Sequence, residues 1–251
     1  DDRSGILCAM LLKWIRDGYV NFTMEPGTGW FKKDKYEIDF SGEIPTENIL
    51  EEKMLGYFRE ASGDNQILEN KEFERWCKRN YEEIEDWFDD LIEFEEKELK
   101  EKGLMKKQTT YKKFLGIDIA NEKVVYEPSF RADIIYTKGL KRFLLDFSSI
   151  EEKEVIEVKL WEEYLMFASI LGIADEVEKQ IGKLCPEFNQ YSNIDYTYTM
   201  LATRTFMYGG VRSAANAYSA AHSSSYSGGG GFSSFGGGGG GFSGGGGGGS
   251  R

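Results

Sequence analysis

The chain has 251 residues and a formal net charge of −12, with 29% charged and 40% hydrophobic residues. This composition is that of a globular protein, with room for one large or two small domains and a tail. The negative charge argues against non-specific binding to nucleic acid or to an anionic membrane. The longest apolar run, near residues 165–174, is shorter than the ~20 residues of a membrane-spanning helix.

The first 45 residues predict a helix followed by a hairpin. Leu11, Leu12 and Ile15 form the apolar side of a helix over residues 6–16. The stretch YVNFTME alternates as a strand, a Pro-Gly turn follows, and WFKKDKYEIDF returns as a second strand. Helix followed by hairpin is the second half of a winged helix, so residues 1–45 are predicted to be a winged-helix-like unit.

Three lysines on the returning strand, Lys32, Lys33 and Lys35, are candidate contacts to DNA phosphates. Carboxylates are interleaved with them, which favours a winged helix that packs against protein. A DNA-binding regulator therefore stays as the alternative to a protein-interaction role, and the chain carries no strong nucleic-acid signal.

Residues 46–107 predict three further helices and a possible second winged-helix-like module. Thr46 is a candidate N-cap for a helix over residues 49–61, and a short helix follows over 71–79. A long acidic helix spans residues 81–102. Its dense carboxylates have no nearby histidine, so they indicate a solvated face rather than a metal or acid–base site. The inward side chains of the first of these helices are predicted to be Leu50, Met54, Leu55 and Phe58.

Residues 108–190 are predicted to form a helical C-terminal unit. The weakly patterned stretch 104–130, with the basic cluster Lys106, Lys107, Lys112 and Lys113, predicts a loop and an exposed helix. In a membrane-tethered parent these lysines could lie near the anionic inner leaflet. A helix is expected over residues 134–147.

The clearest helical periodicity lies in residues 160–181. Trp161 and Tyr164 fall on its apolar face, together with Leu160, Leu165, Ala168 and Leu171. They are either core aromatics or part of a partner-binding groove. Gly172 is a predicted helix end, and Asp175 a predicted cap of a second helix.

The residues from 191 to 251 predict a low-complexity, disordered tail. From Gly228 onward, the only large residues are Phe232, Phe235 and Phe242. Such a segment cannot bury enough surface to offset its chain entropy. The phenylalanines are candidate weak, multivalent partner contacts.

No residue pattern points to catalysis, a cofactor or a metal. The only histidine, His222, falls in the predicted tail, whereas a nucleophilic triad needs a histidine on a rigid scaffold. Cys8, Cys77 and Cys185 are widely spaced and odd in number, which indicates free thiols in a reducing cytoplasm. A carboxylate-based hydrolase stays open as a second alternative, although no acidic pair is singled out.

Two stretches carry a resemblance to a known family. GLKRFLLDFSSIEEKEV (139–155) and LWEEYLMFASILGIADEV (160–177), followed by glycine runs broken by Phe-Ser, resemble the C-terminal region of the YciQ-like predicted bacterial membrane proteins, a family labelled as a domain of unknown function. MLLKWIRDGYVNF (10–22) resembles the winged-helix-like start of the cytoplasmic region of those proteins. The resemblance implies a region at the cytoplasmic face of a membrane, anchored through segments absent from this chain, and it brings no catalytic residues.

The predicted fold class is mainly α with small β-hairpins (α+β), with winged-helix-like modules, a helical C-terminal unit and a disordered Gly-rich tail. The predicted function is non-enzymatic: an intracellular protein-interaction region of a membrane-anchored bacterial protein, with an unknown protein partner.

Overall fold

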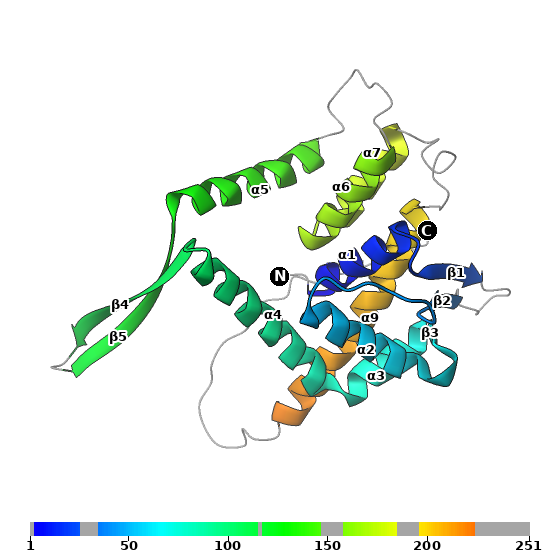
Figure 1. Ribbon diagram of the computed structural model, residues 1–251, viewed down its shortest axis with the longest axis horizontal. Coiled ribbons are helices and arrows are strands. Elements are labelled where there is room, and N and C mark those ends of the chain that lie inside the picture. The colour runs from blue at the N-terminus through cyan, green and yellow to red at the C-terminus, as the bar shows by residue number, and fades with distance from the viewer. Residues whose placement is uncertain (1–2, 26–34, 115–116, 147–157, 185–195, 224–251) are drawn as a thin grey trace, which may run out of the picture.

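The computed structural model describes residues 3–25, 35–114, 117–146, 158–184 and 196–223 (Figure 1). Helices dominate it, accompanied by two small antiparallel sheets, which confirms the predicted α+β class. In chain order the elements are α1 (Arg3–Arg16), β1 (Asn21–Glu25), β2 (Lys35–Asp39), α2 (Ile49–Ser62), the 3-10 turn η1 (Gly63–Asn65), β3 (Ile67–Glu69), α3 (Asn70–Arg79), α4 (Tyr81–Glu101), β4 (Met105–Phe114), β5 (Ile117–Tyr126), α5 (Pro128–Asp146), α6 (Val158–Ile170), α7 (Ala174–Leu184) and α9 (Tyr196–Ser223).

The predicted helix and hairpin at the start of the chain are confirmed as α1, β1 and β2. Leu11, Leu12 and Ile15 are buried, as their spacing predicts. Strand β2 pairs antiparallel with β1 on one side and with β3 on the other, where Ile38 lies opposite Leu68. Residues 1–45 therefore share one sheet with the segment that follows, and the winged-helix comparison stays a prediction.

The three helices predicted between residues 49 and 102 are confirmed as α2, α3 and α4, but the predicted cap of the first is wrong. Asn48, not Thr46, caps α2, because its side chain accepts hydrogen bonds from the backbone N–H groups of Leu50 and Glu51 at 3.0 and 2.9 Å. A capping box between Glu69 and Glu72 starts α3. The predicted inward residues of α2 are all buried: Leu50, Met54, Leu55 and Phe58.

The prediction of a disordered tail from residue 191 is wrong for residues 196–223, which form the 28-residue helix α9. This segment is rich in Tyr, Thr, Ser, Gly and Ala. Its hydropathy, averaged over such residues, does not indicate that one face of the helix is buried. That face is built from Phe206, Met207 and Ala214, with Gly210 between them. The helix packs against α1, α3 and α4, and these neighbours supply the burial that an isolated segment lacks. The Gly-Phe-Ser segment after Ser223 lies outside the described residues.

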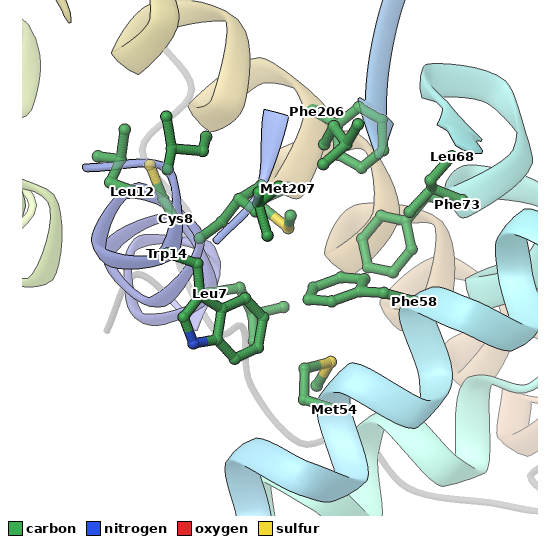
Figure 2. Packing of buried hydrophobic residues seen from close by; sticks show 14 of the residues in the cluster. Leu7, Cys8, Leu12, Trp14, Met54, Phe58, Leu68, Phe73, Phe206 and Met207 are labelled. Carbon is green, nitrogen blue, oxygen red and sulfur yellow. The ribbon is translucent and has the colours of Figure 1, made fainter. Parts of the chain in front are cut away.

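A line of aromatic rings joins four helices through the core (Figure 2). Trp14 of α1 meets Phe58 of α2 edge to face at 6.4 Å, and Phe58 meets Phe73 of α3 at 5.2 Å. Phe73 then stacks on Phe206 of α9 at 5.4 Å and an interplanar angle of 8°. Phe40, which follows β2, stacks on Phe58 at 5.1 Å and ties the sheet to the same line.

The predicted loop and exposed helix over residues 104–130 are wrong, because most of this stretch forms the two-stranded ribbon of β4 and β5. Its ten cross-strand pairs run from Met105 opposite Tyr126 to Phe114 opposite Ile117. Threonine, tyrosine and valine favour strands. However, lysines occur at both odd and even positions of the ribbon, so the sequence shows no alternation of polar and apolar residues. Figure 1 shows the ribbon projecting from the helical body between the end of α4 and the start of α5.

The predicted helices 134–147 and 160–181 are confirmed as α5 and as the pair α6 and α7. Residues 171–173 separate that pair, and Gly172 adopts a positive φ of 67°, as the predicted helix end requires. The predicted cap Asp175 is wrong, because α7 begins at Ala174 and Asp175 lies in its first turn. Helix α5 is held to this pair near its C-terminal end, where Lys141 Nζ donates to the carbonyl oxygen of Leu171 at 2.8 Å.

We expect Phe206→Ala to lower the free energy of unfolding by about 3–5 kcal/mol, because it removes a buried ring that stacks on Phe73. Urea denaturation monitored by far-UV circular dichroism measures this change. The matched control is Leu201→Ala in the same helix, where the side chain is 44% exposed and the expected loss is at most about 1 kcal/mol. Equal effects of the two substitutions would show that α9 is not part of the core.

Candidate docking groove between α1 and α6

Of the five predicted partner-contact residues, the structure describes the side chain of Tyr164 alone. Tyr164 lies on α6, half-buried, with its ring edge-on to Phe143 of α5 at a centroid distance of 6.0 Å. Trp161 belongs to α6, but its side chain lies outside the described part of the structure. The tail residues Phe232, Phe235 and Phe242 also lie outside it. The structure therefore brings Tyr164 against α5, and its role as a partner contact stays a prediction.

Of the three predicted DNA contacts, one lies in the described part of the structure. Lys32 and Lys33 lie outside the described residues, whereas Lys35 begins β2. Its ammonium group lies 2.6 Å from a carboxylate oxygen of Glu37 and 3.0 Å from one of Glu69. These hydrogen bonds raise the pKa of Lys35 above its usual value. Lys35 thus already has two anionic partners, and a phosphate would have to compete with them.

Helices α1 and α6 pack at very short range because small residues meet where they cross. A Cβ atom on Gly5 would overlap the backbone carbonyl of Ser169. One turn further along α1, the Cys8 Sγ lies 3.8 Å from the Ser169 hydroxyl, which donates to the carbonyl oxygen of Leu165 at 3.0 Å. Ser169, Leu165 and Cys8 are all buried. This contact fixes how the outer faces of the two helices stand relative to each other.

Those outer faces enclose a groove of about 460 Å³. Its walls are mostly apolar, and they include two methionines whose flexible side chains adapt to irregular partners. Phe167 and Ile170 of α6 remain 47% and 49% exposed. The lining residues are Ile6, Ala9, Met10, Lys13 and Arg16 from α1 and Glu163, Met166, Phe167 and Ile170 from α6.

The groove also holds three charged side chains, and two of them have neighbours of opposite charge. Lys13 Nζ lies 2.5 Å from Glu47 and 3.8 Å from Glu51, and Arg16 Nε lies 2.8 Å from Asp17. The third is the exposed Glu163. The groove therefore combines an apolar lining with a few charged groups, as a docking site for an amphipathic segment would.

A second hollow, of about 440 Å³, lies over α3 and is lined by Arg75, Lys78 and Arg79. Within the described part of the chain, no carboxylate lines this hollow and Glu163 is the only one that lines the α1/α6 groove, so the described lining of neither hollow presents the two facing acids that a carboxylate-based hydrolase needs. Among the described residues, no group of three or more His, Cys, Asp or Glu side chains is arranged to hold a metal ion. Within the same residues, every helix is too short or too polar to cross a membrane.

Comparison with known proteins finds a family model that is similar to one segment of the chain. Residues 131–181 match the model described as the C-terminal domain of a predicted membrane protein, DUF2207. The match covers most of α5, all of α6 and most of α7, including the α6 wall of the groove. It confirms the resemblance to a domain of unknown function in predicted membrane proteins, while the YciQ-like name and the Gly-rich tail stay predictions. No curated protein and no solved structure matches the chain.

The sequence did contain a signal for the groove. The predicted apolar stripe of α6 left three large apolar residues unexplained, namely Met166, Phe167 and Ile170. A helix with apolar residues around most of its circumference is typically buried on more than one side. The predicted partner contact Tyr164 does not line this groove, whose described α6 wall is made by other residues of the same helix, so a partner-binding role stays a prediction.

We expect Gly5→Ala to destabilise the protein by about 1–3 kcal/mol, because the added methyl group forces α1 and α6 apart at the backbone of Ser169. The matched control is Gly56→Ala in the middle of α2, where a Cβ atom meets open space. That substitution should stabilise the protein by about 0.5–1 kcal/mol through helix propensity. Thermal unfolding of both variants measures whether each substitution raises or lowers the stability. A stabilising effect of Gly5→Ala would contradict the close approach of α1 and α6 at Ser169.

Proposed function

We propose that this chain is a non-enzymatic protein-interaction region at the cytoplasmic face of a membrane-anchored protein, and that the α1/α6 groove binds an amphipathic helix of a partner protein. The observation that carries the proposal is the spacing of the groove's lining residues. On each of two adjacent helices, the lining residues follow the i, i+3, i+4, i+7 pattern of a helix face that packs against another helix. The two rows are Ile6, Ala9, Met10 and Lys13, and Glu163, Met166, Phe167 and Ile170.

The groove between two such rows of side chains has a shape into which a third helix fits. Side-chain ridges of one helix pack into the grooves of its neighbours, and the small side chain of Ala9 lets a third helix approach. A strand or an extended peptide would need exposed backbone hydrogen-bonding groups, which the walls of two helices do not offer. The occupant is therefore a helix that presents apolar side chains at the same spacing.

The energetics favour an apolar partner face. Phe167 and Ile170 are about half exposed, and covering a large apolar side chain contributes ~1.5–3 kcal/mol when burial is complete. Met10 and Met166 can adjust their conformations to the incoming side chains. The charged groups Lys13, Arg16 and Glu163 would meet the polar residues that flank such a face and fix its register.

The proposal is tested by placing a photoreactive phenylalanine analogue at position 167 and irradiating the native host cells. We expect a crosslink to one helical segment of another protein. A synthetic peptide of that segment should bind the purified chain and lose about tenfold or more affinity to Ile170→Asp, because this change removes one apolar wall residue. Thermal unfolding of Ile170→Asp verifies that the half-exposed substitution leaves the fold intact.

The matched control places the same analogue at Tyr208, an exposed aromatic residue of α9 that does not line the groove. The proposal is overturned by the same adduct from both positions, by an adduct within this chain or a second copy of it, or by no adduct at all. Peptide binding that is indifferent to Ile170→Asp overturns it as well.

A further inference from the structure

The ribbon of β4 and β5, which we call the arm, buries few of its described side chains against the rest of the protein, called the body. Of its residues whose burial the structure describes, Met105 is buried, Val125 and Tyr126 are half-buried, and all the others are exposed. The body holds the arm only at its base, where Lys107 pairs with Glu96 at 2.9 Å and Glu127 N–H donates to the carbonyl oxygen of Leu104 at 2.9 Å. An isolated two-stranded ribbon is marginally stable in water, so this arm is suited to lie against another surface.

The arm differs from the body in charge. Residues 105–126 contain five lysines and two carboxylates, whereas the whole chain carries −12. At the base, Lys106 donates a hydrogen bond to Glu127 and Lys107 donates one to Glu96. These bonds raise the pKa of both lysines, so both ammonium groups are already neutralised by neighbours. The cationic residues near the far end are Lys112 and Lys113, and Asp118 stands opposite Lys113 in the cross-strand register, so residues 111–118 carry a net charge of +1.

The length of the arm separates these lysines from the acidic body. Ten strand residues span about 30 Å, which is several times the Debye length of ~8 Å at physiological ionic strength. The negative field of the body is therefore screened at the far end. The argument from net charge against an anionic membrane applies to the body, and it does not extend to the end of the arm.

Two large apolar residues stand at the same end of the arm in the strand register. Phe114 and Ile117 form the last cross-strand pair, directly after Lys112 and Lys113. Tyr111, one residue earlier, is 72% exposed and combines an aromatic ring with a polar hydroxyl. Aromatic and apolar side chains next to lysines are the composition of segments that insert shallowly into the headgroup region of anionic bilayers.

We propose that the far end of the β4–β5 arm, formed by Tyr111, Lys112, Lys113, Phe114 and Ile117, binds the surface of an anionic lipid bilayer. The lysines would neutralise lipid phosphates, while Phe114 and Ile117 enter the boundary between headgroups and acyl chains. The proposal does not depend on the α1/α6 groove. It agrees with the match of residues 131–181 to a predicted membrane protein, because α5 follows the arm directly.

A second copy of this chain is a less suitable binding partner for the end of the arm than a bilayer. Its most acidic element is α4, with eleven carboxylates in 21 residues, and this helix would attract the lysines of the arm. However, the only large apolar side chain that α4 exposes strongly is Ile92, so Phe114 and Ile117 would find little apolar surface there. Glu96 and Glu98 are also already paired with lysines of their own chain.

The test uses the full chain and sedimentation with phosphatidylcholine vesicles, either pure or with about one third phosphatidylglycerol. We expect binding to the anionic vesicles only, with affinity that falls as salt is added. Lys112→Gln with Lys113→Gln should weaken binding about 30-fold, since each lysine near an anionic surface contributes about fivefold. Phe114→Ser with Ile117→Ser should also weaken binding, with little change in the salt dependence.

The matched control is Lys78→Gln with Arg79→Gln, which makes the same change in net charge in the basic hollow over α3. It should bind anionic vesicles as the parent chain does. The thermal midpoints of all variants should agree, because the described contacts between the arm and the body lie at the base of the arm, and Lys78 and Arg79 are exposed. The proposal is overturned by equal binding to neutral vesicles, by no binding, or by the control losing as much affinity as the arm variant. Self-association that depends on Lys112 and Lys113, without vesicle binding, would instead assign the arm to a second copy.

Discussion

Phe206 of α9 stacks on Phe73 of α3 with ring centroids 5.4 Å apart, and the rest of the fold depends on this contact. One turn later Gly210 passes so close to the Phe73 ring and the Cys77 thiol that a side chain there would overlap them. The contact seats the last described helix against α1, α3 and α4. Residues more than 130 positions apart therefore share one core, whose aromatic line continues through Phe58 to Trp14.

The groove between α1 and α6 is a consequence of that arrangement. Trp14 and Leu7 face the core, which leaves Ile6, Met10 and Lys13 of α1 to face outward. Helix α6 docks on this helix where Gly5 allows contact with the backbone of Ser169. One wall of the groove thus comes from the start of the chain and the other from the segment that matches the DUF2207 family model, so neither segment would form the groove alone.

The molecule also separates two kinds of surface. The body is strongly acidic, and α4 carries much of that charge on its solvent side, where ion pairs such as Lys100 with Glu96 offset only part of it. The arm carries lysines and an apolar end away from this field. Screening over the length of the arm separates the charges at its far end from the negative field of the body.

The sequence by itself determined the helices α1 to α7 apart from some of their caps, together with inward residues such as Leu12, Met54 and Phe58, because a period of 3.6 residues is a local property. It could not determine α9, whose small and polar residues become helical through burial against Phe73, nor the ribbon, whose ten pairs join residues up to 21 positions apart. The groove was decided by tertiary structure alone. Periodicity shows that Phe167 and Met10 lie on helix faces, but only the contact at Gly5 and Ser169 sets those two faces side by side.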